Sequence, residues 1–348
     1  MNDRDKLSLT GSMSERSYRY WVWATQVVPL LGVVLAFALA FKYGIGWMEI
    51  ITFLCMSTLG AIGIEIGLHR YFSHKAFKVV KPLSGIFAIL GSMAAMSPIF
   101  FWVYYHRKHH QHSDTEKDPH SPNDVYNNKN GFFRRLLFAH FGWNHSGRFV
   151  EFDLPAETSK DLFQFTDSRF VLWAGRNYNY WVLLGILLPA GICFLLQGTW
   201  YSFLSGALWG GLVRIAVGQH TVWMTNSIAH NFGGRLFETN DKSVNNQYGC
   251  LLFNLIGAVT IYLNAPEPVK IPGVIVFVLW CTLISVGGGW HNNHHAFPSY
   301  AVQQYSWWQI DPFGWLILLW QRLGLASSAA RPSKRKIRNY RAKGGTTS

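Results

Sequence analysis

Paired cysteines and nucleotide-binding motifs are missing from this chain of 348 residues. Its four cysteines lie in apolar stretches without a C-x-x-C pair, which excludes iron–sulfur clusters and a disulfide framework. No glycine-rich dinucleotide fingerprint occurs. The absence of H-E-x-x-H counts against a zinc protease. The chemistry of this chain must therefore come from other residues.

Acidic residues are missing from the C-terminal end, because no carboxylate follows Asp311 while Lys and Arg are frequent there. This basic end accounts for part of the net charge of +13. Next to membrane segments, such charge sets topology and is attracted to anionic lipid, which places the end in the cytoplasm. We therefore expect no nucleic-acid partner and a basic, disordered tail over residues 326–348.

Long apolar runs are frequent. Hydrophobic residues make up 49% of the chain, with 16 Trp, 15 Tyr and 25 Phe, and such rings collect at membrane interfaces. The run from Tyr20 to Phe41 contains no charged residue, and a membrane crossing needs about 20 helical residues. Its length and the charges before it argue against a cleavable signal peptide. Further apolar runs cover 47–68, 83–105, 180–196, 200–225, 251–263 and 274–290.

Nine of the fourteen histidines gather in short motifs. The pattern H-x-x-H-H occurs as HRKHH at 106–110 and as HNNHH at 291–295, while HRYFSH spans 69–74 and NSIAH ends at 230. Positions i, i+3 and i+4 share one face of a helix, so each H-x-x-H-H can direct three imidazoles to one point. His69 and His74 are five residues apart, about 140° on an ideal helix, so we expect the backbone to unwind there.

Nine imidazoles are too many for one metal ion. An octahedral metal takes about six ligands, so the motifs predict a dinuclear centre. Imidazole suits iron, zinc, copper and nickel, and redox chemistry would require iron or copper. Haem is disfavoured because its ligands are single residues on facing spans rather than triplets. The isolated histidines are interpreted as core residues: His112, His120, His140, His145 and His220.

With these motifs the chain resembles the membrane-bound fatty-acid desaturases of the stearoyl-CoA desaturase type. The similar segments run in order through residues 20–325: GLHRYFSHKAFK (67–78), HRKHHQHSDTEKDPHSP (106–122), GFFRRLLFAHFGW (131–143), TNSIAHNFGG (225–234) and GWHNNHHAFP (289–298). The resemblance implies two iron ions as cofactors. It implies these ligands, the asparagine through water: His69, His74, His106, His109, His110, Asn226, His230, His291, His294 and His295.

The resemblance also matches Asp114 and Asp118 to acidic positions of the family. As carboxylates beside ligating imidazoles they could fix the tautomers, with helix capping or a surface ion pair as the alternative. Two departures are visible. Gly288 stands where the family usually has Glu, and an inserted segment lies near 247–275. The second departure puts the substrate scope and the architecture of the cap in doubt.

The predicted fold is an all-α membrane bundle of about four spanning helices in two hairpins, with a cytoplasmic helical cap that holds the dinuclear site. All metal ligands must lie on one side, so the run 83–105 must return rather than cross. By the same parity we expect 251–263 and 274–290 to form a shallow or re-entrant hairpin. Both termini are then cytoplasmic, with an N-terminal segment over 1–19 and the desaturase domain over 20–325.

The predicted function is an O2-dependent fatty acyl desaturase that forms a cis double bond, at the delta-9 position, in an acyl-CoA, acyl-ACP or acyl-lipid. Trp102 and Trp143 are candidate walls of the substrate tunnel. Electrons must come from ferredoxin or a cytochrome b5-like donor, with Arg134, Arg135 and Arg148 as candidate docking charges. The alternatives are a hydroxylase or acetylenase on the same frame, and a histidine-rich metal transporter or sensor.

Overall fold

The computed structural model describes residues 10, 13–123, 131–146, 168–247 and 251–341, which are mainly helical. The first half of this part contains α1 (Glu15–Tyr43), α2 (Trp47–Ala61), the π-helix η2 (Ile62–Ser73), β1 (Lys78–Val79), α3 (Leu83–Met93), α4 (Ile99–His112), α5 (Phe132–His140), η4 (Gly142–His145) and α7 (Ser168–Arg176). The second half contains α8 (Tyr178–Gln197), α9 (Trp200–Gly206), the π-helix η5 (Ala207–Val213), α10 (Arg214–Ser227), α11 (Leu251–Asn264), α12 (Glu267–Val286), η6 (Gly287–Gly289), α13 (His291–Ala296), α14 (Pro312–Arg322), β2 (Ala326–Ser327) and α15 (Lys334–Arg341).

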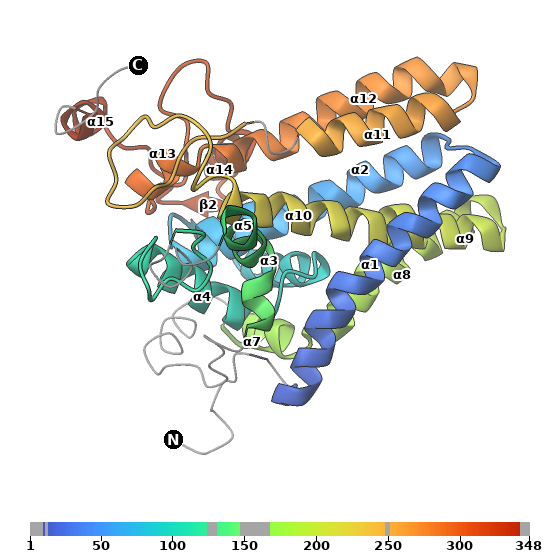
Figure 1. Cartoon of the computed structure of the whole chain (residues 1–348), viewed down its shortest axis with the longest axis horizontal. Helices are drawn as coiled ribbons and strands as arrows, with labels where there is room; N and C mark the ends of the chain where they lie inside the picture. Colours follow the sequence, from blue (N-terminus) through green and yellow to red (C-terminus); the bar gives the residue numbers. More distant parts are fainter. Residues whose placement is uncertain (1–9, 11–12, 124–130, 147–167, 248–250, 342–348) are drawn as a thin grey trace.

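Four helical stretches are long and apolar enough to cross a membrane: Glu15–Tyr43, Trp47–Ser73, Tyr178–Gln197 and Glu267–Ala296. Figure 1 shows the long helices extending to one end of the molecule, while α4, α5, α13 and α14 gather at the other end. We call this second group of helices the cap. The predicted all-α bundle with a helical cap is thereby confirmed.

The fourth candidate span is not the one expected from the sequence. The run 200–225 forms one continuous helix from α9 through η5 to α10, whereas the long apolar stretch begins at Glu267. The shallow hairpin over 251–263 and 274–290 stays a prediction, with two full crossings as its alternative: α12 has 20 residues and so measures about 30 Å, whereas α11 has only 14. Helix α12 starts directly after Pro266. Prolines fit the first helical turn, where no backbone N–H needs a partner within the helix.

The run 83–105 is broken, as predicted. Helix α3 ends at Met93 and α4 begins at Ile99. Between them Ala95 and Ser97 have positive φ angles of 57° and 86°, a conformation that ends a regular helix. Helix α3 also packs very closely on η2, since a Cβ on Gly63 would lie 2.3 Å from the backbone nitrogen of Gly91. The run therefore returns to the cap and carries α4 into it.

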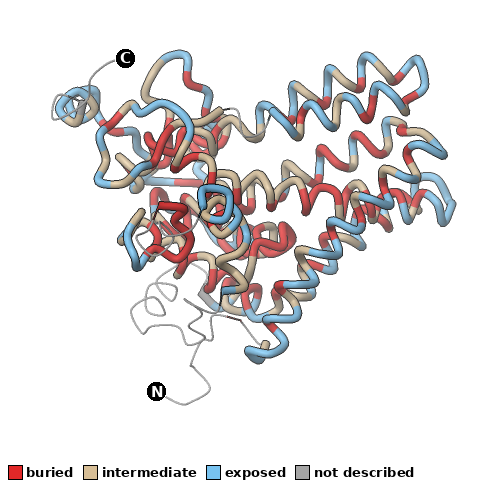
Figure 2. Tube along the Cα trace, viewed as in Figure 1, coloured by how far each residue is buried: buried red, intermediate tan, exposed pale blue. Residues whose placement is uncertain are grey.

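Buried residues concentrate in the cap and where the long helices meet it, while the outer faces of the long helices are exposed (Figure 2). Tyr71, Phe72, Phe87 and Phe100 belong to the core of the cap end. A second core between the long helices contains Phe53, Ile261 and Phe277. Exposed apolar faces on spanning helices are expected where lipid rather than water is the solvent.

The C-terminal segment is more ordered than a disordered tail. Strand β2 pairs antiparallel with β1, with Ala326 opposite Val79. Helix α15 is basic, and the ring of Tyr340 lies 5.6 Å from that of Phe237 and 5.1 Å from that of Phe297. These apolar contacts hold the helix against the cap, which is why its charge alone did not predict its structure.

A buried ion pair joins η2 to the segment before α14. The guanidinium of Arg70 donates to both carboxylate oxygens of Asp311, at 2.8 and 3.0 Å, and to the carbonyl of Ala301 at 2.8 Å. Both side chains are almost fully buried, at 1% and 0% exposure. Asp311 also caps α14 by accepting from the backbone N–H of Gly314. The pair therefore fixes the C-terminal part of the cap to the helix that carries the first histidine.

Asp311→Asn should lower the unfolding free energy by about 3–5 kcal/mol, because it leaves the Arg70 charge buried beside a neutral group. The measurement is chemical unfolding of the protein in detergent micelles. The control is Glu15→Gln, which breaks the Glu15–Arg19 pair, where both side chains are 54% exposed; the expected change is about 1 kcal/mol or less. Equal effects of the two variants would contradict the prediction.

Candidate metal centre

The nine motif histidines meet in the cap as two compact groups. The first group has five members: His69, His74, His106, His110 and His294. The second group has four: His109, His230, His291 and His295. In each group one ring nitrogen from every member lies within 4.8 Å of the others. The structure thus brings together histidines that are more than two hundred residues apart in the sequence.

A π-helix explains how His69 and His74 reach the same point. Their segment does not unwind as predicted, because η2 continues through Ser73. A π-helix bonds residue i to residue i+5, and the backbone N–H of His74 donates to the carbonyl of His69 at 3.2 Å. The wider turn brings the fifth residue back toward the face of the first. The spacing of five was therefore a sign of a π-helix.

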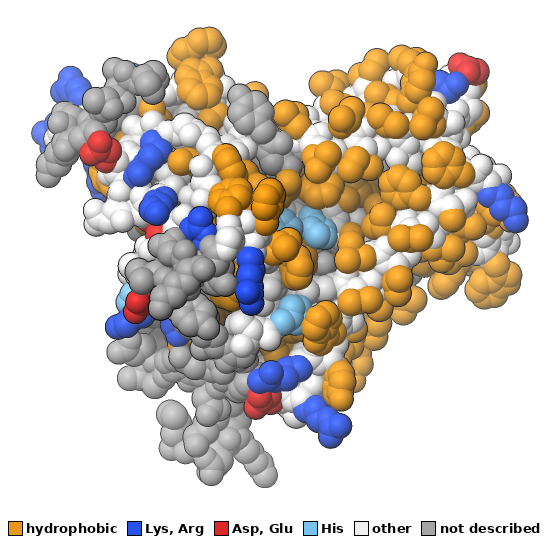
Figure 3. All heavy atoms as spheres, in the orientation of Figure 1, with side chains coloured by type: hydrophobic (Ala, Val, Ile, Leu, Met, Phe, Trp, Pro, Cys, Tyr) orange, Lys and Arg blue, Asp and Glu red, His pale blue; other side chains and the backbone are white. Residues whose placement is uncertain are grey.

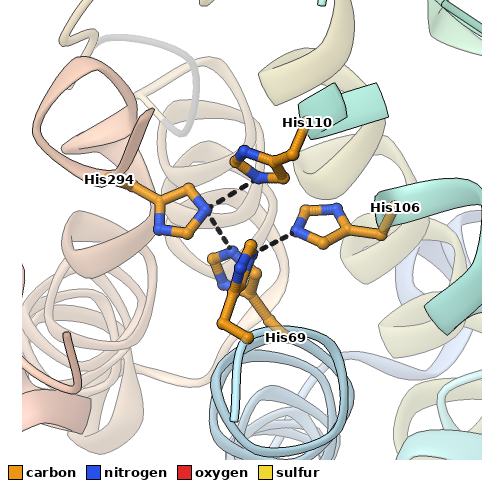
Figure 4. Close-up of side chains that lie close together, drawn as sticks. His69, His106, His110 and His294 are labelled. Atoms are coloured by element: carbon orange, nitrogen blue, oxygen red, sulfur yellow. Dashed lines mark hydrogen bonds between the residues drawn. The ribbon is translucent and has the colours of Figure 1, made fainter. Parts of the chain in front are cut away.

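The spacing of the first group fits ligands around one metal ion. The Nε2 atom of His294 lies 3.0 Å from Nε2 of His69 and 3.0 Å from Nε2 of His110, and the Nε2 atoms of His74 and His106 are 2.8 Å apart (Figure 4). An imidazole–zinc bond is about 2.1 Å long, which puts two ligands at right angles about 3.0 Å apart. The measured separations match that geometry.

The nitrogen atoms of the second group also have the spacing of metal ligands. Nε2 of His230 lies 2.9 Å from Nε2 of His291. Nε2 of His295 is buried and makes no hydrogen bond within the described residues. A buried polar atom without a partner is costly, and a metal ion would satisfy it. The donors of both groups therefore fit metal ions that take imidazole ligands.

Three carboxylates orient the second group. Nδ1 of His109 lies 3.0 Å from Asp118, Nδ1 of His230 lies 3.0 Å from Asp114, and Nδ1 of His295 lies 2.7 Å from Asp241. An ionised carboxylate only accepts hydrogen bonds, so each Nδ1 carries a proton and Nε2 is the nitrogen available to a metal ion. Asp114 and Asp118 thus lie beside His230 and His109, two histidines of the predicted ligand set.

The sequence did not point to Asp241. It lies in the segment between His230 and α11, and only the folding of that segment over the cap brings it to His295. Asp241 also accepts hydrogen bonds from the hydroxyl of Thr239 and the backbone N–H of Ser243 within its own loop. No spacing rule connects residue 241 with residue 295, so a single sequence gave no signal for this pair.

Burial and charge set the protonation of these groups. Burial, together with the neighbouring histidines, lowers the pKa of His74, His106 and His110 well below its ordinary value. These rings are neutral, as metal ligands must be. Burial would raise the pKa of Asp118, but His109 outweighs it and the pKa falls to about 2. Asp118 is therefore ionised at neutral pH.

The other predicted residues lie around the two groups. Asn226 is half-buried and lines a cavity together with Trp102, His106 and Trp143. The Trp102 ring stacks on His106 with 4.6 Å between centroids. His120 stacks on His109 at 4.4 Å. It is thus a core histidine that borders the site.

Three more of the isolated histidines have partners away from the two groups. His140 lies 2.9 Å from His220 and 3.1 Å from the Ser227 hydroxyl, and His145 lies 2.7 Å from the amide oxygen of Gln26. Among the candidate docking arginines, Arg135 contacts the carbonyl of Pro122. Arg148 lies outside the described residues.

Two cavities lie near the histidine groups, and His106 lines the smaller one. The cavity at Trp102 and Trp143 has about 60 Å³. A larger one, about 360 Å³ and mostly apolar, runs between α1, α2, α10, α11 and α12. It extends from Ala229 and Gly288 near the histidines to Phe53 and Phe277 between the long helices. Val222 lines both cavities.

The two sequence departures border the larger cavity. Phe253, Ile256 and Ile261 of the inserted segment line it. Gly288 lies at its histidine end, where an added Cβ would lie 3.2 Å from a carboxylate oxygen of Glu65. Glu65 is a further carboxylate that the sequence analysis missed, although it precedes His69 by four residues and so shares its face of the helix.

Comparison with known proteins gives clear matches. The sequence model of the fatty acid desaturase family matches residues 45–317. The chain is 34% identical over 315 residues to the hex-5-enoyl-[acyl-carrier protein] acetylenase of Moorena producens, covering 89% of this chain and 86% of that protein. It is 31% identical over 291 residues to the sn-1 stearoyl-lipid 9-desaturase of Synechocystis sp., covering 82% and 73%. It is also 31% identical over 317 residues to Delta-9 acyl-lipid desaturase 1 of Arabidopsis thaliana, covering 88% and 86%.

Asp118→Asn should weaken metal binding about 10–100-fold, because the carboxylate that holds the His109 tautomer is lost. The measurement is titration of the metal-free protein with ferrous iron. Glu116→Gln is the matched control, since Glu116 lies in the same loop and is exposed. An unchanged affinity in Asp118→Asn would show that this carboxylate does not orient a ligand.

Proposed function

Because the chain belongs to the fatty acid desaturase family, we propose that it is an O2-dependent fatty acyl desaturase that works with two histidine-bound iron ions. Membership confirms the resemblance inferred from the histidine motifs and makes the chain a member of a family of oxidoreductases. The proposed product is a cis double bond at the delta-9 position, the position that appears in the names of two of the relatives above.

The observation that carries this proposal is the convergence of nine histidines into two compact groups, close in the chain to Glu65, Ala229 and Gly288, which line an apolar cavity. Two groups of imidazoles next to each other suit a pair of metal ions, and the number of donors exceeds what one ion binds. We propose the nine histidines as ligands and Asn226 as a residue that reaches a metal through water. Asp114, Asp118 and Asp241 then orient ligands of the second group.

The proposed reaction converts two adjacent methylenes into an alkene. One O2, two electrons and two protons enter, two further hydrogens leave the acyl chain, and two water molecules form. When bound, iron supplies the redox chemistry that reduces O2 and removes hydrogen from an unactivated methylene. The residues of the chain supply the rest: they hold neutral imidazoles in place and fix the position of the substrate.

The apolar cavities are the proposed place for the acyl chain. Methylene groups differ too little for polar contacts to tell them apart, so an enclosed apolar wall must set which pair reaches the metals. The chain would pass Trp102 and Trp143, cross the junction at Val222, and continue between the long helices toward Phe53. In this arrangement the reacting carbons lie beside His106, which lines the smaller cavity together with Trp102.

An external donor is the proposed source of electrons, either ferredoxin or a cytochrome b5-like protein. In Figure 3 most of the Lys and Arg side chains on view lie over the cap, and hydrophobic side chains cover the long helices. Positive charge collects on the cytoplasmic side of membrane proteins, which supports a cytoplasmic cap and cytoplasmic termini. Arg134 and Arg135 remain candidate contacts for an acidic donor.

A second candidate is an acetylenase, which would dehydrogenate an existing alkene to an alkyne. The match to the acetylenase of Moorena producens favours it. Against the transporter alternative, Glu49 and Arg214, the two internal charges that could mark an ion path, have structural partners. Glu49 accepts from the hydroxyl of Ser205 and the backbone N–H of Gly46, and Arg214 donates to the carbonyls of Gly185 and Gly210.

The direct test is an assay of iron-loaded protein with O2, a reduced donor and acyl chains presented as CoA thioesters, ACP thioesters and glycerolipids. The expected product has lost two hydrogens from a saturated chain, as read by mass spectrometry. A hydroxylase would add one oxygen instead, and an acetylenase would act only on unsaturated chains. Iron-loaded protein that yields no dehydrogenated product with any combination would refute the proposal.

Val222→Trp should close the junction between the two cavities. Val222 lines both cavities, so the larger ring would occupy space proposed for the acyl chain. We expect desaturation of long chains to fall about tenfold or more, while the iron content stays that of the wild type. Leu279→Trp is the control, because Leu279 is 67% exposed on the outer face of α12. Full activity of Val222→Trp on long chains would rule out this path.

A further inference from the structure

Carboxylates are distributed unequally over the two histidine groups. Three of the four histidines in the second group contact an aspartate at 2.7–3.0 Å. In the first group, Nδ1 of His294 lies 3.2 Å from the amide nitrogen of Gln303. Among the described residues, the first group's carboxylate contact within 4.0 Å is that of Glu65, with Oε2 at 3.5 Å from Nδ1 of His69. Glu65 is therefore the candidate to orient a ligand of the five-histidine group.

The surroundings of Glu65 leave it no other role. Its Oε2 atom is buried and makes no hydrogen bond in the described structure. Its neighbours in η2 include Ile64 and Ile66, which are both buried. Arg70 is near, but both terminal nitrogens of its guanidinium bond to Asp311. A buried carboxylate is costly without a partner, and the Nδ1–H of His69 is the donor within reach.

The backbone opposite Glu65 leaves space for the carboxylate. Gly288 lies in η6, three residues before His291. A Cβ at this position would lie 3.2 Å from Oε1 of Glu65, which is tighter than an ordinary van der Waals contact. The φ angle of Gly288 is not in the left-handed region that favours glycine. Space for Glu65, rather than backbone conformation, therefore accounts for the glycine.

We propose that Glu65 is the positioning residue of the five-histidine group. Its carboxylate accepts the Nδ1–H of His69 and directs Nε2 of that ring toward the metal. Gly288 has no side chain and so leaves space for the carboxylate of Glu65. The proposal rests on the proposed function in one respect, namely that the first group binds a metal ion. It assigns Glu65 no direct contact with metal or substrate.

The test uses the full chain in detergent micelles, reconstituted with 57Fe, and compares wild type with Glu65→Ala and Glu65→Gln. Mössbauer spectra resolve the two iron sites, and chelator competition measures their affinities. In Glu65→Ala we expect one of the two iron signals to change and its affinity to fall about 10–100-fold. Glu65→Gln should retain part of the affinity, because an amide oxygen still accepts from Nδ1–H.

Glu49→Gln is the matched control. Glu49 is a carboxylate on the same continuous helix and lines the same cavity, but it bonds to Ser205 and Gly46. Its replacement should leave both iron signals unchanged. A second variant places a carboxylate on the backbone opposite position 65, by combining Gly288→Glu with Glu65→Ala. This double variant should recover iron affinity at the changed site.

The outcomes separate this proposal from the proposed function. Wild type that binds two iron ions and forms alkene, with Glu65→Ala unchanged in spectrum and affinity, overturns the role of Glu65 alone. Equal loss of both irons in Glu65→Ala also overturns it, because that result indicates a general loss of structure. Wild type that binds no iron overturns both proposals.

Discussion

The structure of the cap depends on one interaction: nine imidazoles from four separate segments converge on two places, where the proposed metal ions require neutral rings. A histidine can ligate only through a nitrogen that carries no proton, so the second nitrogen needs a partner that fixes the tautomer. Asp118 holds the proton of His109, Asp114 that of His230, and Asp241 that of His295. The cap is built around these pairs. Burial of the rings and ionisation of the carboxylates follow from the same contacts.

The long helices position parts of the candidate metal centre and enclose a cavity next to it. They deliver η2 and α13 to the cap, and they leave an apolar cavity of about 360 Å³ that ends beside the histidines. The buried Arg70–Asp311 pair then ties the C-terminal part of the cap to η2. Polar chemistry is thereby confined to one end of the cavity, while an apolar chain can be enclosed along the rest of its length.

The sequence predicted which histidines gather but not how they are shared between the two groups. Each H-x-x-H-H was expected to direct three imidazoles to one point, whereas His106 and His110 lie in the first group and His109 in the second. Positions i+3 and i+4 differ by about 100° around an α-helix, so their rings can point to two different places. For His69 and His74 a departure from the ordinary helix was predicted correctly, but it takes the form of a π-helix rather than an unwound segment. Glu65 could have been found, since it precedes His69 by four residues.

Other features could not be predicted because they depend on contacts between distant segments. Asp241 meets His295 only after the segment following His230 folds across the cap. Helix α15 is held by contacts of Tyr340 with Phe237 and Phe297, which outweigh the polar composition of the tail. The start of α12 at Glu267 lies within the inserted segment, where a proline at the start of the helix is compatible with its first turn.

Whether the two histidine groups each hold an iron ion can be measured by anomalous X-ray diffraction from crystals of the iron-loaded protein, recorded at the iron absorption edge. We expect two anomalous peaks, one among the five imidazoles around His69 and one among the four around His295. No peak among these rings, or one peak shared by both groups, would contradict a centre of two histidine-bound ions.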